Sequence, residues 1–394
     1  MTKSNLIRDI DFEISSLCNA GCSVCMRRRD GHFTEFNQTY WKLEDVKNTI
    51  DVDIIKNLLG FNICGNFGDA MTNPDIVKII EWIRSINKKC SINIRTNGGV
   101  GSPDMYASLA KHNVIMSFGI DGVGTSNELY RVNVKWDKLF ENLKSFSENA
   151  ESYQIEIQFL LWSETSNQLL PIIDLAQSVK CGSLYLRKPY TQGEYTEVYN
   201  MKGESTHFLT ELKHPSVETL TKKMWTLIEL NDLKSFIIDS NIPEPTLRKS
   251  NNQIKPCVVH KYNPYTPLPI NYTEEETNQI KHINKQTCYS KNRNDFYDLT
   301  KSLYNIYITH NKLVMPCCML PPYISNAITH STGTENSFQR EILNRMYEIG
   351  FDNFSLEKRT LREIIDSGVL DEFVYKDLEN NKQFGLCKIH CGKC

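Results

Sequence analysis

The first 190 residues alternate between short runs with strand character and longer segments with helical spacing. RDIDFEI at 8–14 alternates polar and apolar residues, which is typical of a strand. PDIVKIIEWIRSI at 74–86 begins with Pro and Asp and repeats isoleucine at helical spacing, which predicts a helix. Read in this way, the predicted strands are 8–14, 60–64, 91–99, 113–122, 153–162 and 183–189, and the predicted helices between them are 74–86, 103–112, 134–150 and 167–180.

Regular alternation of strand and helix predicts βαβ units and a parallel sheet, hence an α/β fold. Six such units fit either a doubly wound sheet or an incomplete barrel, and the pattern alone leaves both open. In either architecture the functional loops follow the carboxyl ends of the strands.

The length and charge of the chain set wide limits. The chain has 394 residues, which is enough for two or three domains. Its 45 Lys and Arg against 47 Asp and Glu give a formal net charge of −2, which provides no electrostatic argument for nucleic acid or an anionic membrane. We find no apolar signal sequence at the start and no run of about 18 apolar residues, so we expect a cytoplasmic protein without membrane spans.

Cysteine usage changes this picture. The chain has 13 cysteines, and in a reducing compartment such a number favours metal or redox chemistry over disulfides. Cys64, Cys90 and Cys181 lie in or beside apolar runs, and we expect them to be buried thiols. The others form two groups, which predict one metal region each: Cys18, Cys22 and Cys25 near the start, and Cys257, Cys288, Cys317, Cys318, Cys387, Cys391 and Cys394 near the end.

Unusual residues follow four successive predicted strands. The cysteine triplet follows the first strand, and the segments after the next three are Gly65-Asn66-Phe67-Gly68-Asp69, Thr96-Asn97-Gly98-Gly99 and Gly119-Ile120-Asp121-Gly122. Each loop taken alone is ordinary turn chemistry. Four such loops on one face of a parallel sheet predict a shared ligand site.

The first triplet admits two kinds of metal site. A structural zinc ion prefers four ligands, and His32 could complete a Cys3His set. Three thiolates on a [4Fe–4S] cluster instead leave one iron open to a cofactor or substrate.

The C-x3-C-x2-C spacing in the loop after the first strand resembles that of radical S-adenosylmethionine (radical SAM) enzymes. The resemblance extends over roughly the first half of the chain. It implies a partial (β/α)6 TIM-like barrel and an iron–sulfur enzyme. A [4Fe–4S] cluster on three cysteines would bind S-adenosyl-L-methionine and cleave it reductively to a 5′-deoxyadenosyl radical, with electrons from a donor such as flavodoxin or ferredoxin.

The same resemblance implies roles for individual residues. Cys18, Cys22 and Cys25 would be the cluster ligands, and Val24 would pack near the adenine. Gly65, Phe67, Gly68 and Asp69 resemble the family's Gly-Gly-Glu-Pro loop, which receives the cofactor's ammonium group. The remaining cofactor-binding residues implied are Thr96, Asn97 and Gly98 after the third strand, Gly119 and Asp121 after the fourth, and Arg131 for the carboxylate, although Arg131 could equally be a solvated arginine.

The second half breaks the alternation. We interpret 191–255 as a linker or substrate-facing segment with one helix at 216–238. In 256–394 we expect a hairpin over 303–320, turning at His310-Asn311, and a helix at 360–378.

Four thiolates from these distant segments could close a second [4Fe–4S] cluster, and zinc is the competing occupant. The arrangement resembles the SPASM or reduced twitch auxiliary domain, a small α+β unit, although Lys312 stands at the approximate place of its hairpin glycine. The expected ligands are Cys288, Cys317, Cys391 and Cys394. Cys387 is nearly equivalent, Cys318 could replace Cys317, and Cys257 could be a ligand or a buried thiol.

The leading hypothesis is therefore a radical SAM oxidoreductase or peptide-modifying enzyme with domains at 1–190, 191–255 and 256–394. It would abstract hydrogen from a peptide or protein side chain or a small metabolite, leading to dehydrogenation, crosslinking or epimerisation. One alternative is a zinc-stabilised Cys-rich binding protein. Another is an RNA-modifying radical SAM enzyme, against which the near-neutral charge argues. Tyr185, Arg187 and Lys188 at the last strand are candidate substrate contacts or ordinary strand residues, and the sequence identifies no general acid or base.

Overall fold

The structure is a computed structural model that describes residues 2–25, 27–29, 32–33, 38–63, 65–189, 194–249, 305–316 and 337–375. The predicted ligands of the second cluster, Cys257, Cys288, Cys317, Cys318, Cys387, Cys391 and Cys394, lie outside these residues, as does Cys64.

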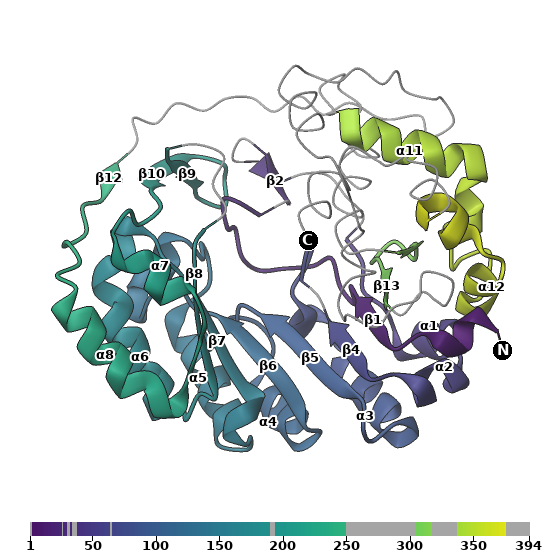
Figure 1. The fold of residues 1–394 in the computed structure, drawn as a ribbon, viewed down its shortest axis with the longest axis horizontal. Coiled ribbons are helices and arrows are strands. Elements are labelled where there is room, and N and C mark those ends of the chain that lie inside the picture. Colours follow the sequence, from purple (N-terminus) through teal and green to yellow (C-terminus); the bar gives the residue numbers. More distant parts are fainter. Residues whose placement is uncertain are drawn as a thin grey trace.

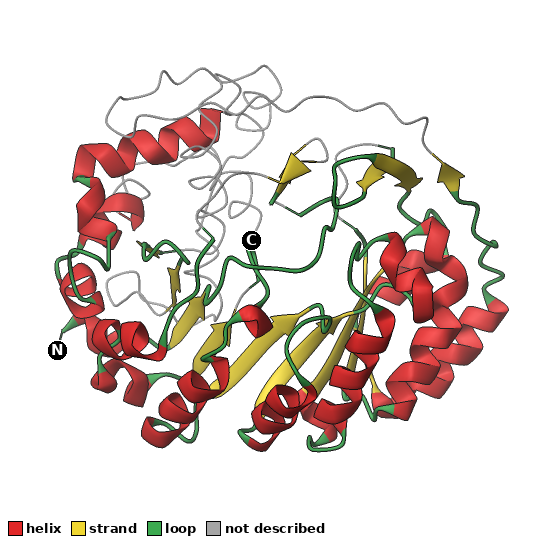
Figure 2. Ribbon diagram, turned by 180° about the vertical axis from the view of Figure 1, so that it is seen from behind, coloured by secondary structure: helices red, strands yellow, loops and turns green. Residues whose placement is uncertain are grey.

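One nine-stranded sheet forms the centre of the described structure (Figures 1 and 2). Its strand order is β11-β8-β7-β6-β5-β4-β1-β13-β14. All pairs from β8 to β13 are parallel, and the two outermost pairs are antiparallel. The strands are β1 (Asp9–Phe12), β4 (Gly60–Ile63), β5 (Ser91–Thr96), β6 (Val114–Gly119), β7 (Ile155–Leu160), β8 (Ser183–Arg187), β11 (Met224–Thr226), β13 (Asn305–Ile308) and β14 (Val314–Met315).

The order from β1 and β4 to β8 follows the chain without the reversal of a doubly wound sheet. The predicted α/β fold is confirmed, and of its two architectures the structure has the partial barrel. Figure 1 shows the strands as an open arc with helices along its outer side. These helices are α1 (Leu43–Thr49), α2 (Val52–Asn57), α3 (Ile76–Ile86), α4 (Pro103–Lys111), α5 (Trp136–Ser147), α6 (Leu169–Ser178), α7 (Ser216–Thr221) and α8 (Leu230–Asp239).

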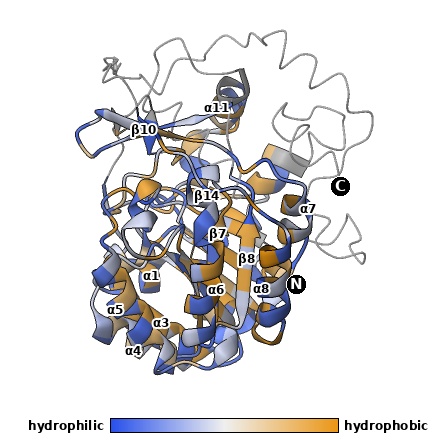
Figure 3. Cartoon of the chain, turned by 90° about the vertical axis from the view of Figure 1, so that its left-hand side faces the viewer, coloured by the Kyte–Doolittle hydropathy of each residue, from blue (hydrophilic) through white to orange (hydrophobic). Residues whose placement is uncertain are grey.

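Alternation along each strand decides which side chains face the helices. In β5, Ile92, Ile94 and Thr96 are buried, whereas Ser91 and Arg95 are exposed and Asn93 is half-buried. Since alternate residues point to opposite faces, the buried set packs under the helices and the polar set lines the inside of the arc. Figure 3 shows β8 as largely apolar, surrounded by helices that carry both polar and apolar residues.

The predicted single helix over 216–238 is wrong. The segment forms α7, the short strand β11 and then α8, and β11 pairs antiparallel with β8, with Trp225 opposite Leu184. Trp225 is buried, and its indole Nε1 donates a 3.0 Å hydrogen bond to the carbonyl oxygen of Leu220. Pairing with the open edge of the sheet thus overrides the helical spacing, because tertiary contacts outweigh local propensity.

A second, smaller sheet lies in the stretch predicted to be a linker. It comprises β9 (Thr196–Tyr199), β10 (Ser205–Leu209) and β12 (Arg248–Lys249), all antiparallel. Figure 1 places β9 and β10 above the open side of the arc, near the two-residue strand β2 (Arg28–Arg29), which pairs with β3 (His32–Phe33).

The predicted hairpin is present and joins the central sheet. β13 lies parallel to β1 and turns through Thr309–Lys312 into β14. Lys312, the residue at the expected glycine position, adopts a left-handed φ of 59°. This left-handed backbone conformation favours glycine, and the turn adopts it here with a lysine at that position.

The C-terminal helices are α11 (Ser337–Ile349) and α12 (Leu361–Asp366). The predicted helix over 360–378 ends early, because Gly368 has a φ of 80° and turns the chain before a short π-helical turn at Asp371–Tyr375.

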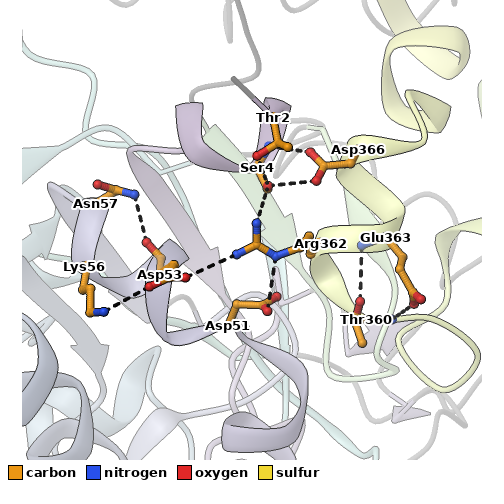
Figure 4. A network of polar contacts seen from close by, with 10 residues as sticks. All are labelled: Thr2, Ser4, Asp51, Asp53, Lys56, Asn57, Thr360, Arg362, Glu363 and Asp366. Atoms are coloured by element: carbon orange, nitrogen blue, oxygen red, sulfur yellow. Dashed lines mark hydrogen bonds and ion pairs between the residues drawn. The ribbon is translucent and has the colours of Figure 1, made fainter.

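Helix α12 is fastened to the N-terminal segment and to the start of α2 (Figure 4). Asp366 accepts hydrogen bonds from the backbone and hydroxyl of Ser4 at 2.8 and 3.0 Å. Arg362 donates to Asp51 at 3.3 Å and lies 4.0 Å from Asp53.

Within the described ranges, no helix has the length and apolar character needed to cross a bilayer.

Candidate functional site

A cavity of about 340 Å³ lies at the carboxyl ends of the central strands. Four of the loops that the sequence singled out contribute to its wall. The lining residues are Cys18, Ala20, Cys22, Val24, Cys25, Arg27, Gly65, Asn66, Gly68, Asp69, Arg95, Thr96, Asn97, Ser117, Gly119, Tyr130, Arg131 and Gln158.

Most of the predicted site residues therefore meet in one place, and three of them lie behind the cavity wall. Phe67 is buried with its ring 5.0 Å from that of His310, Asp121 is buried, and Gly98 holds a φ of 73° in the loop after β5. They support the cavity from behind: Phe67 and Gly98 each lie next to a lining residue, and Asp121 holds the lining Arg131.

The cysteine loop is held in place by backbone and amide donors. The backbone N–H of Ala20 lies 3.4 Å from the sulfur of Cys18, and the Asn97 amide donates to the same sulfur at 3.5 Å. On the other side of the loop, Arg131 lies 3.9 Å from the sulfur of Cys22. Donors and a cation beside sulfur favour thiolates, which are the form that binds metal.

Burial acts in the opposite direction on these thiols. It raises the pKa of Cys18 to about 12, with the nearby Asp69 carboxylate adding to the effect, and it also raises the pKa of the buried Cys22. Without a metal ion, burial therefore favours the protonated thiol form of both groups. Metal binding at this loop must therefore release protons.

The cysteine loop is compatible with a cluster, and the side chain of His32, the further ligand considered for zinc, lies outside the described residues. Among the described residues no three His, Cys, Asp or Glu side chains converge closely enough to hold one metal ion. In a [4Fe–4S] cluster each thiolate binds a different iron, so three cysteines can surround the cluster without converging on one point. The cavity wall carries three thiols from one loop together with the Asp69 carboxylate, and three thiolates are a donor set that leaves one iron of a [4Fe–4S] cluster open.

Asp69 has a buried carboxylate with a defined orientation. It accepts hydrogen bonds from the backbone N–H groups of Met71 at 3.0 Å and Asn97 at 2.7 Å, and from the Thr96 hydroxyl at 2.8 and 3.0 Å. Burial raises its pKa, while the two backbone N–H groups and the Thr96 hydroxyl oppose that effect. The Thr96 hydroxyl has a single proton, so the two distances to it count as one hydrogen bond. Three hydrogen bonds on about four lone-pair sites leave Asp69 one further site.

Close approach explains the glycine before Asp69. A Cβ on Gly68 would clash with the carbonyl oxygen of Ser15, and Asp69 donates from its backbone N–H to Leu17 at 2.7 Å. The loop after β4 therefore rests directly on the chain that enters the cysteine triplet.

Arg131 is a cavity residue and not a solvated surface arginine. Its Nε donates to Oδ2 of Asp121 at 2.6 Å, and its side chain is 21% exposed. Burial raises the pKa of Asp121, and the Arg131 charge lowers it again; the same ion pair raises the pKa of Arg131 despite burial. A Cβ on Gly119 would lie 2.6 Å from Nη2 of Arg131, so a larger residue here would push the guanidinium out of this position.

Arg27 and Arg28 were missed by the sequence analysis. Arg27 donates to the carbonyl oxygens of Ala20 and Cys18 at 3.2 and 3.3 Å, and so braces the cysteine loop from inside. Arg28 donates to the carbonyl oxygens of Tyr199 and Asn200 at 2.9 and 2.8 Å, which joins the same loop to the end of β9. The partners of Arg27 lie in the cysteine loop itself, whereas those of Arg28 lie far away along the chain, where no local sequence signal identifies them.

Three further cavity residues, Arg95, Ser117 and Gln158, were also missed. Each occupies an inward-facing position of its strand, on β5, β6 and β7 respectively. A polar residue at an alternating position inside an otherwise apolar strand is the signal that could have identified them.

The other predicted contacts have mixed outcomes. Arg187 stacks over the ring of Tyr185 at 4.8 Å, at the end of β8, and neither residue lines the cavity described above; the same holds for Lys188. Cys90 and Cys181 are buried, as predicted.

Comparison with known proteins relates the N-terminal part of the chain to one protein family. Residues 12–160 match the family model of the Radical SAM superfamily. This region runs from the end of β1 to the end of β7 and contains the cysteine triplet and the three loops that follow. No curated protein sequence matches the chain.

Several solved structures are similar to this chain at low identity. SuiB of Streptococcus suis bound to S-adenosylmethionine has 14% identity and a TM-score of 0.47, covering 80% of this chain and 61% of that one. SuiB bound to the precursor peptide SuiA has 14% identity and a TM-score of 0.49, covering 99% and 72%. Native anSMEcpe with bound AdoMet has 14% identity and a TM-score of 0.48, covering 98% and 89%. The chain thus spans less than two thirds of the S-adenosylmethionine-bound SuiB chain.

Proposed function

We propose that the chain is a radical SAM enzyme that binds a [4Fe–4S] cluster and S-adenosyl-L-methionine in the cavity above β1 and β4–β7. The observation that carries this proposal is the meeting of three thiols with the Asp69 carboxylate and three guanidinium groups, Arg131 among them, in a single cavity. S-adenosylmethionine presents an ammonium group, a carboxylate, a diol and a flat base. A cavity with opposite charges and close-approach glycines suits such a ligand.

Different residues of the cavity would bind different groups of the cluster and the cofactor. Cys18, Cys22 and Cys25 would hold three irons and leave the fourth for the cofactor. Asp69 would receive the ammonium group with its remaining lone-pair site, and Arg131, fixed through its Nε by Asp121, would offer its outer nitrogens to the carboxylate. When bound, the cluster supplies the electron that cleaves the sulfonium group of S-adenosylmethionine.

The chain's own residues keep this chemistry away from water. Tyr130 is buried behind Arg131, and the ribbon of β9 and β10 is tied onto the cysteine loop by Arg28. Excluding water protects a reactive radical from side reactions.

Finer assignments extend the proposal. The substrate is a peptide or protein side chain or a small metabolite, and the reaction after hydrogen abstraction is dehydrogenation, crosslinking or epimerisation. The C-terminal cysteines would hold one auxiliary [4Fe–4S] cluster in a SPASM- or twitch-like domain. The electron donor would be a flavodoxin or ferredoxin in the cytoplasm.

Anaerobic reconstitution tests the proposal. We expect about four irons per chain with one cluster and about eight with two, together with reductive release of 5′-deoxyadenosine from S-adenosylmethionine. Cys18→Ala should lose that release, because one iron would lose its ligand.

Cys181→Ala is the matched control, since Cys181 is buried outside the cavity. It should retain iron and cleavage. Full cleavage by Cys18→Ala, or one bound zinc and no iron in the reconstituted protein, would contradict the proposal.

A further inference from the structure

The inner wall of the arc carries polar side chains in rows that cross the strands. One row consists of Asp11 on β1, Asn62 on β4 and Asn93 on β5, which are paired in register. Asn62 donates to Asp11 at 2.9 Å, and Asn93 donates to Asn62 at 2.8 Å. This row satisfies its polar groups internally.

The next row is different. Arg95 on β5 pairs with Ser117 on β6, which pairs with Glu156 on β7. Gln158 donates to the Ser117 hydroxyl at 2.8 Å, and Ser117 also hydrogen bonds to Glu156. Arg95 makes no hydrogen bond or ion pair within the part of the chain that the structure describes, although its side chain is exposed to the same cavity as the cysteine triplet.

The charge on this wall is unbalanced toward the positive. Arg95 and Arg187 carry two guanidinium groups, and both act to lower the pKa of one carboxyl group on this wall, Glu156. Burial raises the pKa of Glu156, so this carboxyl group loses its proton less readily than an exposed one. A guanidinium without a partner in a cavity wall presents a planar fork of donors that fits an oxyanion in two-point geometry.

We propose that Arg95, with Ser117 and Gln158 beside it, is a binding site for an oxyanion of the substrate, a carboxylate or a phosphate. The proposal rests on the proposed function, because it places this group next to the cofactor. The carboxylate of S-adenosylmethionine has its own partner in Arg131, which lines the cavity from the segment after β6. The substrate of this chain is therefore an acidic molecule or carries an acidic group near the reacting carbon.

Probe binding to the full chain tests this site. The probes are N-acetyl-L-glutamate, its neutral counterpart N-acetyl-L-glutaminamide, and inorganic phosphate, titrated with and without S-adenosylmethionine. We expect an anionic probe to bind at least tenfold more tightly than the neutral one, and Arg95→Gln to remove that difference. Arg95→Lys should restore only part of it, because lysine keeps the charge and loses the fork.

Arg248→Gln is the control, since Arg248 is exposed on β12 and absent from the cavity wall. It should bind the probes as the unaltered chain does. Preference for N-acetyl-L-glutamate over phosphate assigns a carboxylate, and the reverse preference assigns a phosphate. Equal binding of charged and neutral probes, or anion binding that survives Arg95→Gln, would overturn the proposal.

Two further measurements separate this inference from the proposed function. Arg95→Gln should bind and cleave S-adenosylmethionine without substrate as the unaltered chain does; loss of cofactor binding would assign Arg95 to the cofactor and overturn the substrate site. The probe titration is also run on the protein without iron. A chain that binds the anion through Arg95 but never takes up iron or releases 5′-deoxyadenosine would refute the proposed function and leave the anion site standing.

Discussion

The guanidinium of Arg131 and the carboxylate of Asp121 form a 2.6 Å ion pair at the end of β6, with the carboxylate fully buried. Asp121 also accepts a 2.7 Å hydrogen bond from the backbone N–H of Leu160. One carboxylate thus joins the ends of two neighbouring strands to the cavity arginine, and it orients Arg131 without itself lining the cavity.

Replacing Asp121 should therefore destabilise the fold. Asp121→Ala leaves the Arg131 charge without its partner, and breaking a buried pair in this way costs about 3–5 kcal/mol. The free energy of unfolding in urea measures the loss. Asp174→Ala is the control, because its ion pair with Lys234 is exposed and should contribute about 0–1 kcal/mol. Equal effects of the two substitutions would contradict the structural role of Asp121.

Gly119→Ala should weaken cofactor binding while every charge is kept. The added Cβ would displace Nη2 of Arg131, and a hydrogen bond to a charged group contributes about 1.5–3 kcal/mol. We expect the affinity for S-adenosylmethionine to fall by about tenfold or more, measured by equilibrium binding to reconstituted protein. Because both changes act on one contact, Gly119→Ala combined with Arg131→Gln should bind no more weakly than Arg131→Gln alone. Additive losses would contradict this coupling.

Arg28→Gln should increase the mobility of the antiparallel pair β9 and β10. The substitution removes both hydrogen bonds to the carbonyl oxygens of Tyr199 and Asn200 and the contact with the Phe33 ring at 4.4 Å. Amide hydrogen exchange over 196–209 should then become faster, even in protein without iron. Arg248→Gln on β12, whose side chain is exposed, should leave the exchange unchanged. No change in the Arg28 variant would mean that other contacts hold the ribbon.

His207 should make the same ribbon sensitive to acid. Its Nε2 lies 2.9 Å from the carbonyl oxygen of Leu129, and burial lowers its pKa below 6.5. The unfolded chain then takes up a proton before the folded chain does as the pH falls. The contribution of His207 is therefore present above pH 6.5 and is lost as the pH falls below that value.

Urea unfolding at pH 7.5 and at pH 5.5 measures this effect. The free energy of unfolding should decline more steeply with acidification in the unaltered chain than in His207→Gln, which cannot take up that proton. His112→Gln is the control, because the His112 side chain lies at the surface beside Glu81. Identical slopes for the unaltered chain and His207→Gln would refute the role of His207.

The local pattern of polar and apolar residues was sufficient to predict those elements whose type depends only on residues nearby in the sequence. The isoleucines of α3 and the alternation in β5 give the correct element type, because burial on one face requires that spacing. The segment around Trp225 could not be predicted, since its strand exists only through pairing with β8. The helix predicted over 360–378 ends early for a local reason, because the helical spacing does not show the left-handed turn at Gly368.

The candidate site divides in the same way. Cys18, Cys22 and Cys25 are recognisable from spacing, because one loop supplies all three, and Asp69 follows from its glycine-rich loop. Arg28 and Arg95 have no such signal. The first acts through carbonyl oxygens some 170 positions later, and the second is distinguished by having no partner among the described residues.

The parallel pairing of β13 with β1 makes the barrel depend on the order of synthesis. β1 ends at Phe12 and its outer neighbour begins at Asn305, so this edge of the sheet waits for about 300 residues of translation. At about 5–20 residues per second this is about 15–60 s on the ribosome. During that time the backbone of β1 presents an unpaired edge, which is a template for aggregation. Expression at reduced temperature or with chaperones should therefore increase the yield of folded protein more than changes at the cavity do.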